Sequence, residues 1–202
     1  MSLNIFSPSE DNHLAQGIHK TKLNGLFYVE HKVFPDDRGF FAEVAKIPEL
    51  NEVGFEFHPE NGQINWAEMV ANSIKGFHTE DWRKLITVMS GDAFCAIADV
   101  RPESETFKEV EVFRLGLGKK CLRGSLLLEA GLGNSVCAIT GPVQYLYITD
   151  KMYKDRDPSG DQAISLFDPE LGVEWPITKE QMIISERDKQ AVSLKELTKI
   201  NP

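Results

Sequence analysis

The feature that most constrains the fold is a succession of short apolar runs, each of strand length, separated by turn-forming residues. The runs are rich in β-branched and aromatic residues, and several alternate polar with apolar positions, which is typical of strands with one buried face. They cover residues 26–33, 40–47, 72–77, 85–91, 93–100, 110–115, 125–130, 135–140 and 143–149. This pattern predicts an all-β domain of the sandwich or barrel type.

Turn signals and helical patterns complete this expectation. Four groups of Gly, Pro, Asp and Asn residues predict turns between the strands, at 35–39, 90–92, 131–134 and 140–142. Helical pattern is confined to the ends of the chain, notably 178–183 and 193–200, where a Ser or Thr can cap the first turn. We therefore expect a β-sandwich with short peripheral helices, mainly at the C-terminal end.

Length and composition indicate one domain. The chain has 202 residues, of which 42% are hydrophobic and 26% charged, enough to bury a single core. No linker or repeat interrupts it, so we expect a single domain over 1–202, with an arm of about 24 residues at the N-terminal end and a helical segment of about 20 at the other. No apolar run reaches membrane-spanning length and the first residues lack the pattern of a secretory signal, so we expect a cytoplasmic protein with no membrane partner.

The charge balance narrows the class of partner. The formal net charge is −9 and no run of Lys and Arg occurs, which disfavours a nucleic-acid partner. A small anionic ligand remains compatible, because two or three well-placed cations can hold a diphosphate. Cys95, Cys121 and Cys137 are odd in number, far apart and set among apolar residues, so we interpret them as small buried side chains rather than as bridges or zinc ligands.

The stretch SIKGFHTEDWRKL, residues 73–85, carries the first candidate chemistry. A histidine such as His78 can accept a proton near neutral pH when a partner orients it, and Lys84 follows six residues later. Taken alone, the histidine could simply end a strand and the lysine could be a solvated surface charge. Asp168 precedes a proline, which favours the interpretation that it is a turn residue. Tyr147 shares a strand face with another tyrosine, so it could be a core aromatic.

Several other kinds of site lack their usual motifs. A metal-binding cupin would show two histidines one residue apart, whereas residues 76–80 contain one histidine and the other four are scattered upstream. No serine-nucleophile elbow, reactive-cysteine setting, dinucleotide fingerprint or phosphate loop occurs. The sequence therefore favours a metal-free site without a bound nucleotide cofactor.

Eight stretches, in their order and spacing, resemble the dTDP-4-dehydrorhamnose 3,5-epimerases of the cupin superfamily. They extend over roughly residues 25–190 and lie at 34–44, 62–65, 72–78, 84–94, 98–107, 145–153, 167–176 and 185–188. The resemblance implies a jelly-roll homodimer without metal or cofactor, whose substrate is a nucleotide-diphosphate sugar. It also implies a place in the synthesis of dTDP-rhamnose, a surface polysaccharide or a decorated metabolite.

The resemblance assigns roles to four side chains. The family's reaction removes a proton beside the C4 ketone of a dTDP-4-keto-6-deoxyhexose, or a related 4-keto nucleotide sugar, and returns a proton to the opposite face of the enolate. His78 matches the base and Asp168 matches the carboxylate paired with it. Lys84 matches the cation at the enolate oxygen, and Tyr147 matches the acid on the other face.

The resemblance also implies residues that bind the substrate, partly across a dimer interface. Those of the RGxFxE stretch are Arg38, Phe40, Phe41 and Glu43. Gln63 and Asn65 match positions beside the sugar. Lys75 stands where the family has an arginine for the diphosphate. The stretch around Asn134, residues 133–135, stands where the family has a histidine-glycine-phenylalanine loop, so a second histidine is missing and the identities of the nucleotide and the sugar stay open. The alternatives are an epimerase acting at C5 or C3 alone, a ketoisomerase, and a carbohydrate-binding cupin without turnover.

Overall fold

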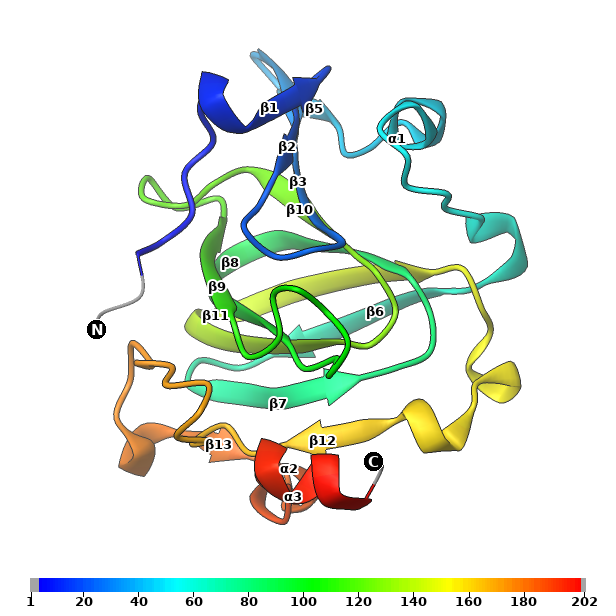
Figure 1. The fold of residues 1–202 in the computed structure, drawn as a ribbon. Helices are drawn as coiled ribbons and strands as arrows, with labels where there is room; N and C mark the ends of the chain where they lie inside the picture. The colour runs from blue at the N-terminus through cyan, green and yellow to red at the C-terminus, as the bar shows by residue number, and fades with distance from the viewer. Residues whose placement is uncertain (1–3, 201–202) are drawn as a thin grey trace.

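Two long antiparallel strands organise the protein, whose computed structural model describes residues 4–200 (Figure 1). They are β8 (Lys84–Asp99) and β11 (Leu132–Thr149), and they pair from Leu132 opposite Asp99 to Thr149 opposite Lys84. Both bend near their middle, so each contributes to both halves of one extensively paired sheet. The halves pack against each other, which makes the β-sandwich expected from the sequence.

The remaining strands extend these two halves. Beside the second part of β8 and the first part of β11 lie β7 (Ser73–Thr79), β9 (Val110–Gly116), β12 (Gln162–Ile164) and β13 (Ile183–Ile184). Beside the other parts lie β6 (Ile64–Met69), β10 (Gly124–Leu128), β3 (Leu26–Glu30), β2 (Ile18–Lys20) and β1 (His13–Ala15). A separate hairpin is formed by β4 (Lys32–Asp36) and β5 (Gly39–Glu43).

The predicted turns at 90–92 and 140–142 are wrong, because both are bends inside continuous strands. Gly91 has a φ of +82°, and a Cβ there would lie 2.8 Å from the carbonyl oxygen of Pro142. Only glycine fits this left-handed position against the facing backbone. The pairing of β11 shifts register between Ala138 and Tyr145, so the strand bends by bulging without leaving the ladder.

The helices are short and peripheral, as expected. They are α1 (Ile47–Glu52), α2 (Glu186–Lys189) and α3 (Leu194–Ile200), with single 3-10 turns at Glu10–Asn12, Pro59–Asn61, Tyr153–Asp155, Pro158–Gly160 and Lys179–Gln181. The helix expected over 178–183 is only one of these turns and is followed by β13, whereas α3 fits the expectation for 193–200. Among residues 4–200 no helix has the length and apolarity to cross a bilayer; the cytoplasmic location stays a prediction.

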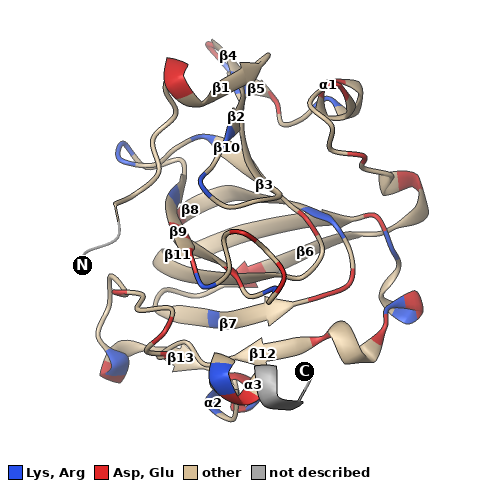
Figure 2. Ribbon diagram, viewed as in Figure 1, with Lys and Arg blue, Asp and Glu red and all other residues tan. Residues whose placement is uncertain are grey.

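The core fills the space between the halves of the sandwich and the space under the C-terminal segment. The cluster of buried side chains between the halves includes Tyr28, Phe113 and Leu126. The cluster under the C-terminal segment includes Phe77. Acidic and basic residues lie mostly on loops and edges, while the central strands carry few of them (Figure 2). Cys95 and Cys137 are buried as expected, but Cys121 is only partly buried. A charged side chain in the middle of the sandwich is therefore exceptional.

Candidate active site

A cavity of about 400 Å³ opens between the central strands, and it gathers most of the residues that the sequence singled out. Strands β7, β8, β6 and β11 build its walls, and α2 borders it. The lining side chains are Gln63, Asn65, Lys75, His78, Glu80, Trp82, Lys84, Ile86, Asn134, Val136, Tyr145, Tyr147, Thr149, Tyr153, Asp161 and Arg187. His78, Lys84 and Tyr147 thus converge although they come from three different strands.

The partner of His78 is Asp188, at the end of the chain. The Nε2 atom of His78 lies 2.6 Å from Oδ1 of Asp188, while Oδ2 accepts a hydrogen bond from the backbone N–H of Gly76 at 3.1 Å. Burial alone would raise the pKa of Asp188, but its hydrogen bonds from His78 and Gly76 outweigh burial and lower it. A Cβ on Gly76 would lie 3.0 Å from the carboxylate, so glycine makes room for this contact.

Asp168 does not pair with His78, so the carboxylate assignment is wrong. Its Oδ1 accepts from the backbone N–H of Glu170 at 2.8 Å, and its Oδ2 accepts from that of Leu194 at 2.7 Å. The residue is 3% exposed and does not line the cavity. The aspartate before Pro169 closes a turn and holds the start of α3, which is the ordinary structural role that such a residue suggests.

The two tyrosines on β11 differ in what their hydroxyls contact. Both face the cavity, because they are two residues apart on one strand. The Tyr145 hydroxyl accepts a hydrogen bond from Asn134 Nδ2 at 3.2 Å and is buried. Tyr147 is only partly buried, and its hydroxyl bonds to none of the described residues. Burial, and secondly the charge of Glu80, raise the pKa of Tyr147, which therefore stays protonated at neutral pH.

Four of the predicted binding residues line the cavity. Gln63 Nε2 donates to Asn65 Oδ1 at 2.6 Å, so these two amides hold each other in place. The Lys75 ammonium lies 6.0 Å from the ring centroid of Tyr145, and burial lowers its pKa although Asp188 opposes this. Asn134 is the fourth, directly opposite His78 in the ladder.

The other four predicted binding residues lie away from the cavity of their own chain. All belong to the β4 and β5 hairpin: Arg38, Phe40, Phe41 and Glu43. The Arg38 side chain is 90% exposed and pairs with Asp36, its neighbour in the turn. Phe40 and Phe41 are 52% and 66% exposed, which is unusual for two adjacent phenylalanines.

Several residues that line the cavity or contact its lining were not singled out from the sequence. Asp188 lies in the SERD stretch, where the spacing from Ser185 is that of a helix cap, and the Ser185 hydroxyl does accept from the Asp188 N–H at 3.1 Å. That pattern signals a helix start and says nothing of a histidine partner. Arg187 and Glu80 look like ordinary surface charges in the sequence, and only the fold brings them to the cavity.

Two buried polar atoms of the cavity lack a hydrogen-bond partner among the described residues. They are Nε1 of Trp82, a side chain that is 6% exposed, and Oδ1 of Asn134. Buried polar groups are normally satisfied, so these two atoms show that the polar network around the cavity is incomplete. No group of three or more His, Cys, Asp or Glu residues in the described part of the chain is arranged to hold a metal ion, and the metal-free expectation stays a prediction.

Comparisons with known proteins agree with this geometry. A family model described as dTDP-4-dehydrorhamnose 3,5-epimerase matches residues 20–196. The enzymes of that name from Streptomyces griseus and Methanothermobacter thermautotrophicus are each 29% identical to this chain, covering 87% and 88% of it and 85% and 94% of their own lengths. The solved structure of the dTDP-4-dehydrorhamnose 3,5-epimerase from Bacillus anthracis superposes on this chain with a TM-score of 0.75 at 28% identity. The match covers 86% of this chain and 97% of that one. The Mycobacterium tuberculosis rmlC epimerase, at 22% identity and a TM-score of 0.81 over 92% of each chain, shares the fold.

Proposed function

Because the chain belongs to the dTDP-4-dehydrorhamnose 3,5-epimerase family, we propose that it is an isomerase that inverts the two carbons flanking the ketone of a dTDP-4-keto-6-deoxyhexose. One observation carries the proposal. A histidine with a buried carboxylate partner, a buried lysine and a tyrosine with a free hydroxyl all line one cavity. Removal and return of a proton on opposite faces of a carbon requires a base, an acid and a charge at the enolate oxygen.

His78 is the base in this proposal. The lowered pKa of Asp188 keeps its carboxylate ionised, so His78 Nε2 carries the hydrogen of the 2.6 Å contact. In the neutral imidazole the other ring nitrogen, Nδ1, then has no proton and can accept one from the carbon beside the ketone. The resulting imidazolium is stabilised by the carboxylate, as in other histidine and aspartate pairs.

Lys84 and Tyr147 complete the reaction. The Lys84 ammonium lies in the wall of the cavity with its side chain 5% exposed, where a fixed charge is little screened by water. There it would stabilise the negative oxygen of the enolate. Tyr147 would then protonate the opposite face, since its raised pKa keeps the proton available and its hydroxyl holds no other partner among the described residues.

Two cations are available for the diphosphate. Lys75 and Arg187 both line the cavity, and the planar guanidinium of Arg187 can make the bidentate contact that an ammonium cannot. Arg187 pairs with Asp161 at 2.6 Å, which holds it at this border. We assign the diphosphate to these two side chains.

We further propose that the protein is a homodimer in which the β4 and β5 hairpin reaches the partner's cavity. The exposure of Phe40 and Phe41 supports this, because two adjacent aromatic rings in water are unfavourable unless something covers them. Arg38 and Glu43 lie on the same hairpin and would then contact the nucleotide bound in the other subunit.

Exchange of hydrogen with solvent tests the function. The protein would be incubated in D₂O with dTDP-4-keto-6-deoxyglucose, and the mass and stereochemistry of the sugar followed. We expect deuterium at both C3 and C5, with inversion at each. Deuterium at one position would contradict action at both carbons, and bound but unlabelled sugar would contradict an epimerase and favour a binding protein.

A further inference from the structure

Glu80 is a carboxylate in the cavity that the reaction described above does not use. It lies just after β7, and its Oε2 accepts a hydrogen bond from the Nζ atom of Lys84. The Lys84 side chain is 5% exposed and that of Glu80 is 17% exposed, so the pair is largely shielded from water. In the proposed reaction the Lys84 ammonium stabilises the enolate oxygen, so the role of a carboxylate in contact with it has to be explained.

The turn that carries Glu80 is held firmly on both sides. The carbonyl of Glu80 accepts from the backbone N–H of Gly131 at 2.9 Å. Three residues further on, Arg83 donates from its backbone N–H to Asp150 and from its Nε to Glu129, both at 2.9 Å. The backbone that carries the Glu80 side chain is therefore held in place by the fold.

Burial without a partner disfavours the charged form of a lysine, and a carboxylate in contact with it restores that form. A neutral amine could not stabilise an enolate, and an ammonium on a flexible stem could point elsewhere. We infer that Glu80 is a positioning residue, which keeps Lys84 charged and directs its Nζ atom to the ketone oxygen. This inference rests on the proposed epimerase function.

Other ionisable groups line the cavity or lie behind its lining, and the carboxylates among them are already engaged. Asp188 bonds His78 and Gly76, and Asp161 pairs with Arg187 and with another arginine. The remaining ionisable side chains of the lining come from β7, β11, α2 and the turn after β11, and are Lys75, His78, Tyr145, Tyr147, Tyr153 and Arg187. Glu80 is thus the carboxylate that balances Lys84 among the described residues.

Titration of the lysine tests the charge without any substrate. The ¹³Cε resonance of Lys84 would be assigned in ¹³C-lysine-labelled protein by its loss in Lys84→Met, then followed against pH. In Glu80→Gln we expect it to titrate at a pH about one to three units lower than in the unsubstituted protein. The matched control is Glu129→Gln, which removes another carboxylate that holds the same turn but lies outside the cavity. An unmoved titration in Glu80→Gln would overturn the inference.

Kinetics test the positioning. In Glu80→Gln we expect kcat for deuterium exchange to fall by about 10-fold to 100-fold, more at pH 9 than at pH 7, with little change in KM. Glu80→Asp keeps the negative charge but shortens the side chain by one methylene. The titration of Lys84 should therefore stay close to that in the unsubstituted protein, while kcat still falls. A faster Glu80→Gln, or an equal loss at every pH, would overturn the inference. Unsubstituted protein that exchanges nothing would refute the proposed function, whereas the titration would still decide the role of Glu80.

Discussion

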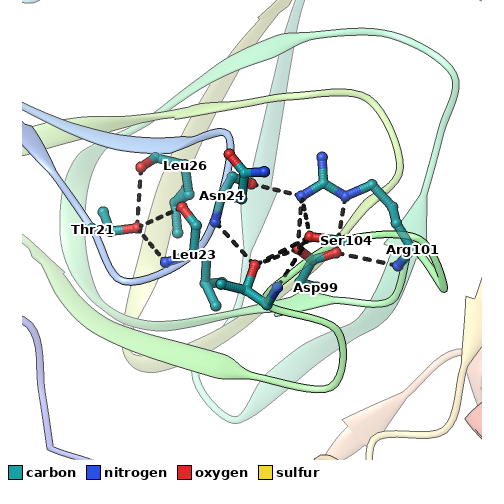
Figure 3. Close-up of polar contacts among 8 residues, drawn as sticks. Thr21, Leu23, Asn24, Leu26, Asp99, Arg101 and Ser104 are labelled. Carbon is teal, nitrogen blue, oxygen red and sulfur yellow. Dashed lines mark hydrogen bonds and ion pairs between the residues drawn. The ribbon is translucent and has the colours of Figure 1, made fainter.

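Two regions of this molecule hold buried carboxylates, and they differ in whether their partners are complete. In the first, Asp99 is fully buried and accepts hydrogen bonds from Arg101, Ser104 and Thr106, while Arg101 also donates to the Asn24 carbonyl at 2.6 Å (Figure 3). In the second, at the cavity, Asp188 contacts His78 and Glu80 contacts Lys84, and both of these basic side chains line the cavity.

The difference teaches how to separate structural charge from functional charge. Around Asp99 both carboxylate oxygens accept hydrogen bonds from the protein, and the cluster joins the end of β8 to the loop before β3. In the cavity, Nε1 of Trp82 and Oδ1 of Asn134 have no partner among the described residues, and the Tyr147 hydroxyl bonds to none of them. A complete network stabilises the fold, whereas an incomplete one is available to a ligand.

Removing the base should have the largest effect. In His78→Ala we expect exchange at both carbons to fall by about 10,000-fold or more, since His78 is the one histidine among the described residues that line the cavity. The free energy of unfolding should fall by about 1 to 3 kcal/mol, because the buried Asp188 carboxylate loses its contact with His78. Mass-detected exchange, with urea unfolding beside it, measures both. Exchange that survives in His78→Ala would place the base elsewhere in the cavity.

Removing the acid should separate two activities within the cavity. Tyr147→Phe keeps the ring packing, so we expect inversion to fall by about 100-fold to 10,000-fold. Exchange should survive in part, because deuterated His78 can return a deuteron to the face from which the proton left. Recovered, uninverted substrate carrying deuterium is the expected product. Equal loss of exchange and inversion would show that Tyr147 is not the opposed acid.

Substitution in the Asp99 cluster should lower the stability of the fold and leave the exchange activity unchanged. In Asp99→Asn we expect a loss of about 2 kcal/mol in the free energy of unfolding, because the partly buried Arg101 loses its counter-ion and the Ser104 and Thr106 hydroxyls lose a charged acceptor. Exchange per folded molecule should be unchanged, which mass detection on the folded fraction would show. A variant of unchanged stability but impaired exchange would remove the distinction between the two regions.

The hydrogen bonds to Asp99 also predict an acid response. Burial would raise its pKa, but the bonds from Arg101, Ser104 and Thr106 outweigh burial and lower it below 3.8. A depressed folded pKa gives stability above the unfolded value, and that stability is lost as the pH falls through the folded value. Urea unfolding between pH 5 and 2 should therefore show a steeper acid loss in the unsubstituted protein than in Asp99→Asn.

A histidine outside the cavity gives the smallest effect. Burial lowers the pKa of His31 from 6.5 to about 4, and its Nε2 lies 2.8 Å from the Ser125 hydroxyl. Because the unfolded chain binds the proton more readily, this part of the stability is present above pH 6.5 and is lost as the pH falls toward 4. Urea unfolding of His31→Gln should lack that component, with exchange unaffected. If the free energy of unfolding of His31→Gln had the same pH dependence as that of the unsubstituted protein, this assignment to His31 would be wrong.

Much of the fold could be predicted from the sequence, because strand patterning depends on neighbouring residues. The alternation of apolar positions located most strands correctly. It could not show that Gly91 bends a strand rather than ending it, since the same residue serves both purposes and the facing backbone at Pro142 decides. Local pattern also overestimated the helix near Lys179, where pairing of β13 with β7 takes over.

Individual residues of the candidate site could be predicted from the sequence, but the contact between two residues that are distant in the chain could not. His78, Lys84 and Tyr147 were correctly placed in one cavity. The carboxylate partner was wrong, because Asp168 and Asp188 both lie far along the chain from the histidine and local sequence gives no register between them. The choice depends on α2 docking beside β7, which brings Asp188 to Gly76.

The central claim is that the His78 and Asp188 pair performs proton abstraction, and one comparison tests it most directly. Deuterium incorporation into dTDP-4-keto-6-deoxyglucose would be measured in Asp188→Asn and in Asp168→Asn under identical conditions. We predict a fall of about 100-fold to 10,000-fold in Asp188→Asn, since the imidazole loses its orientation and its counter-charge. Asp168→Asn should keep its exchange rate per folded molecule, because its carboxylate holds only backbone N–H groups. Retained exchange in Asp188→Asn together with lost exchange in Asp168→Asn would contradict the account.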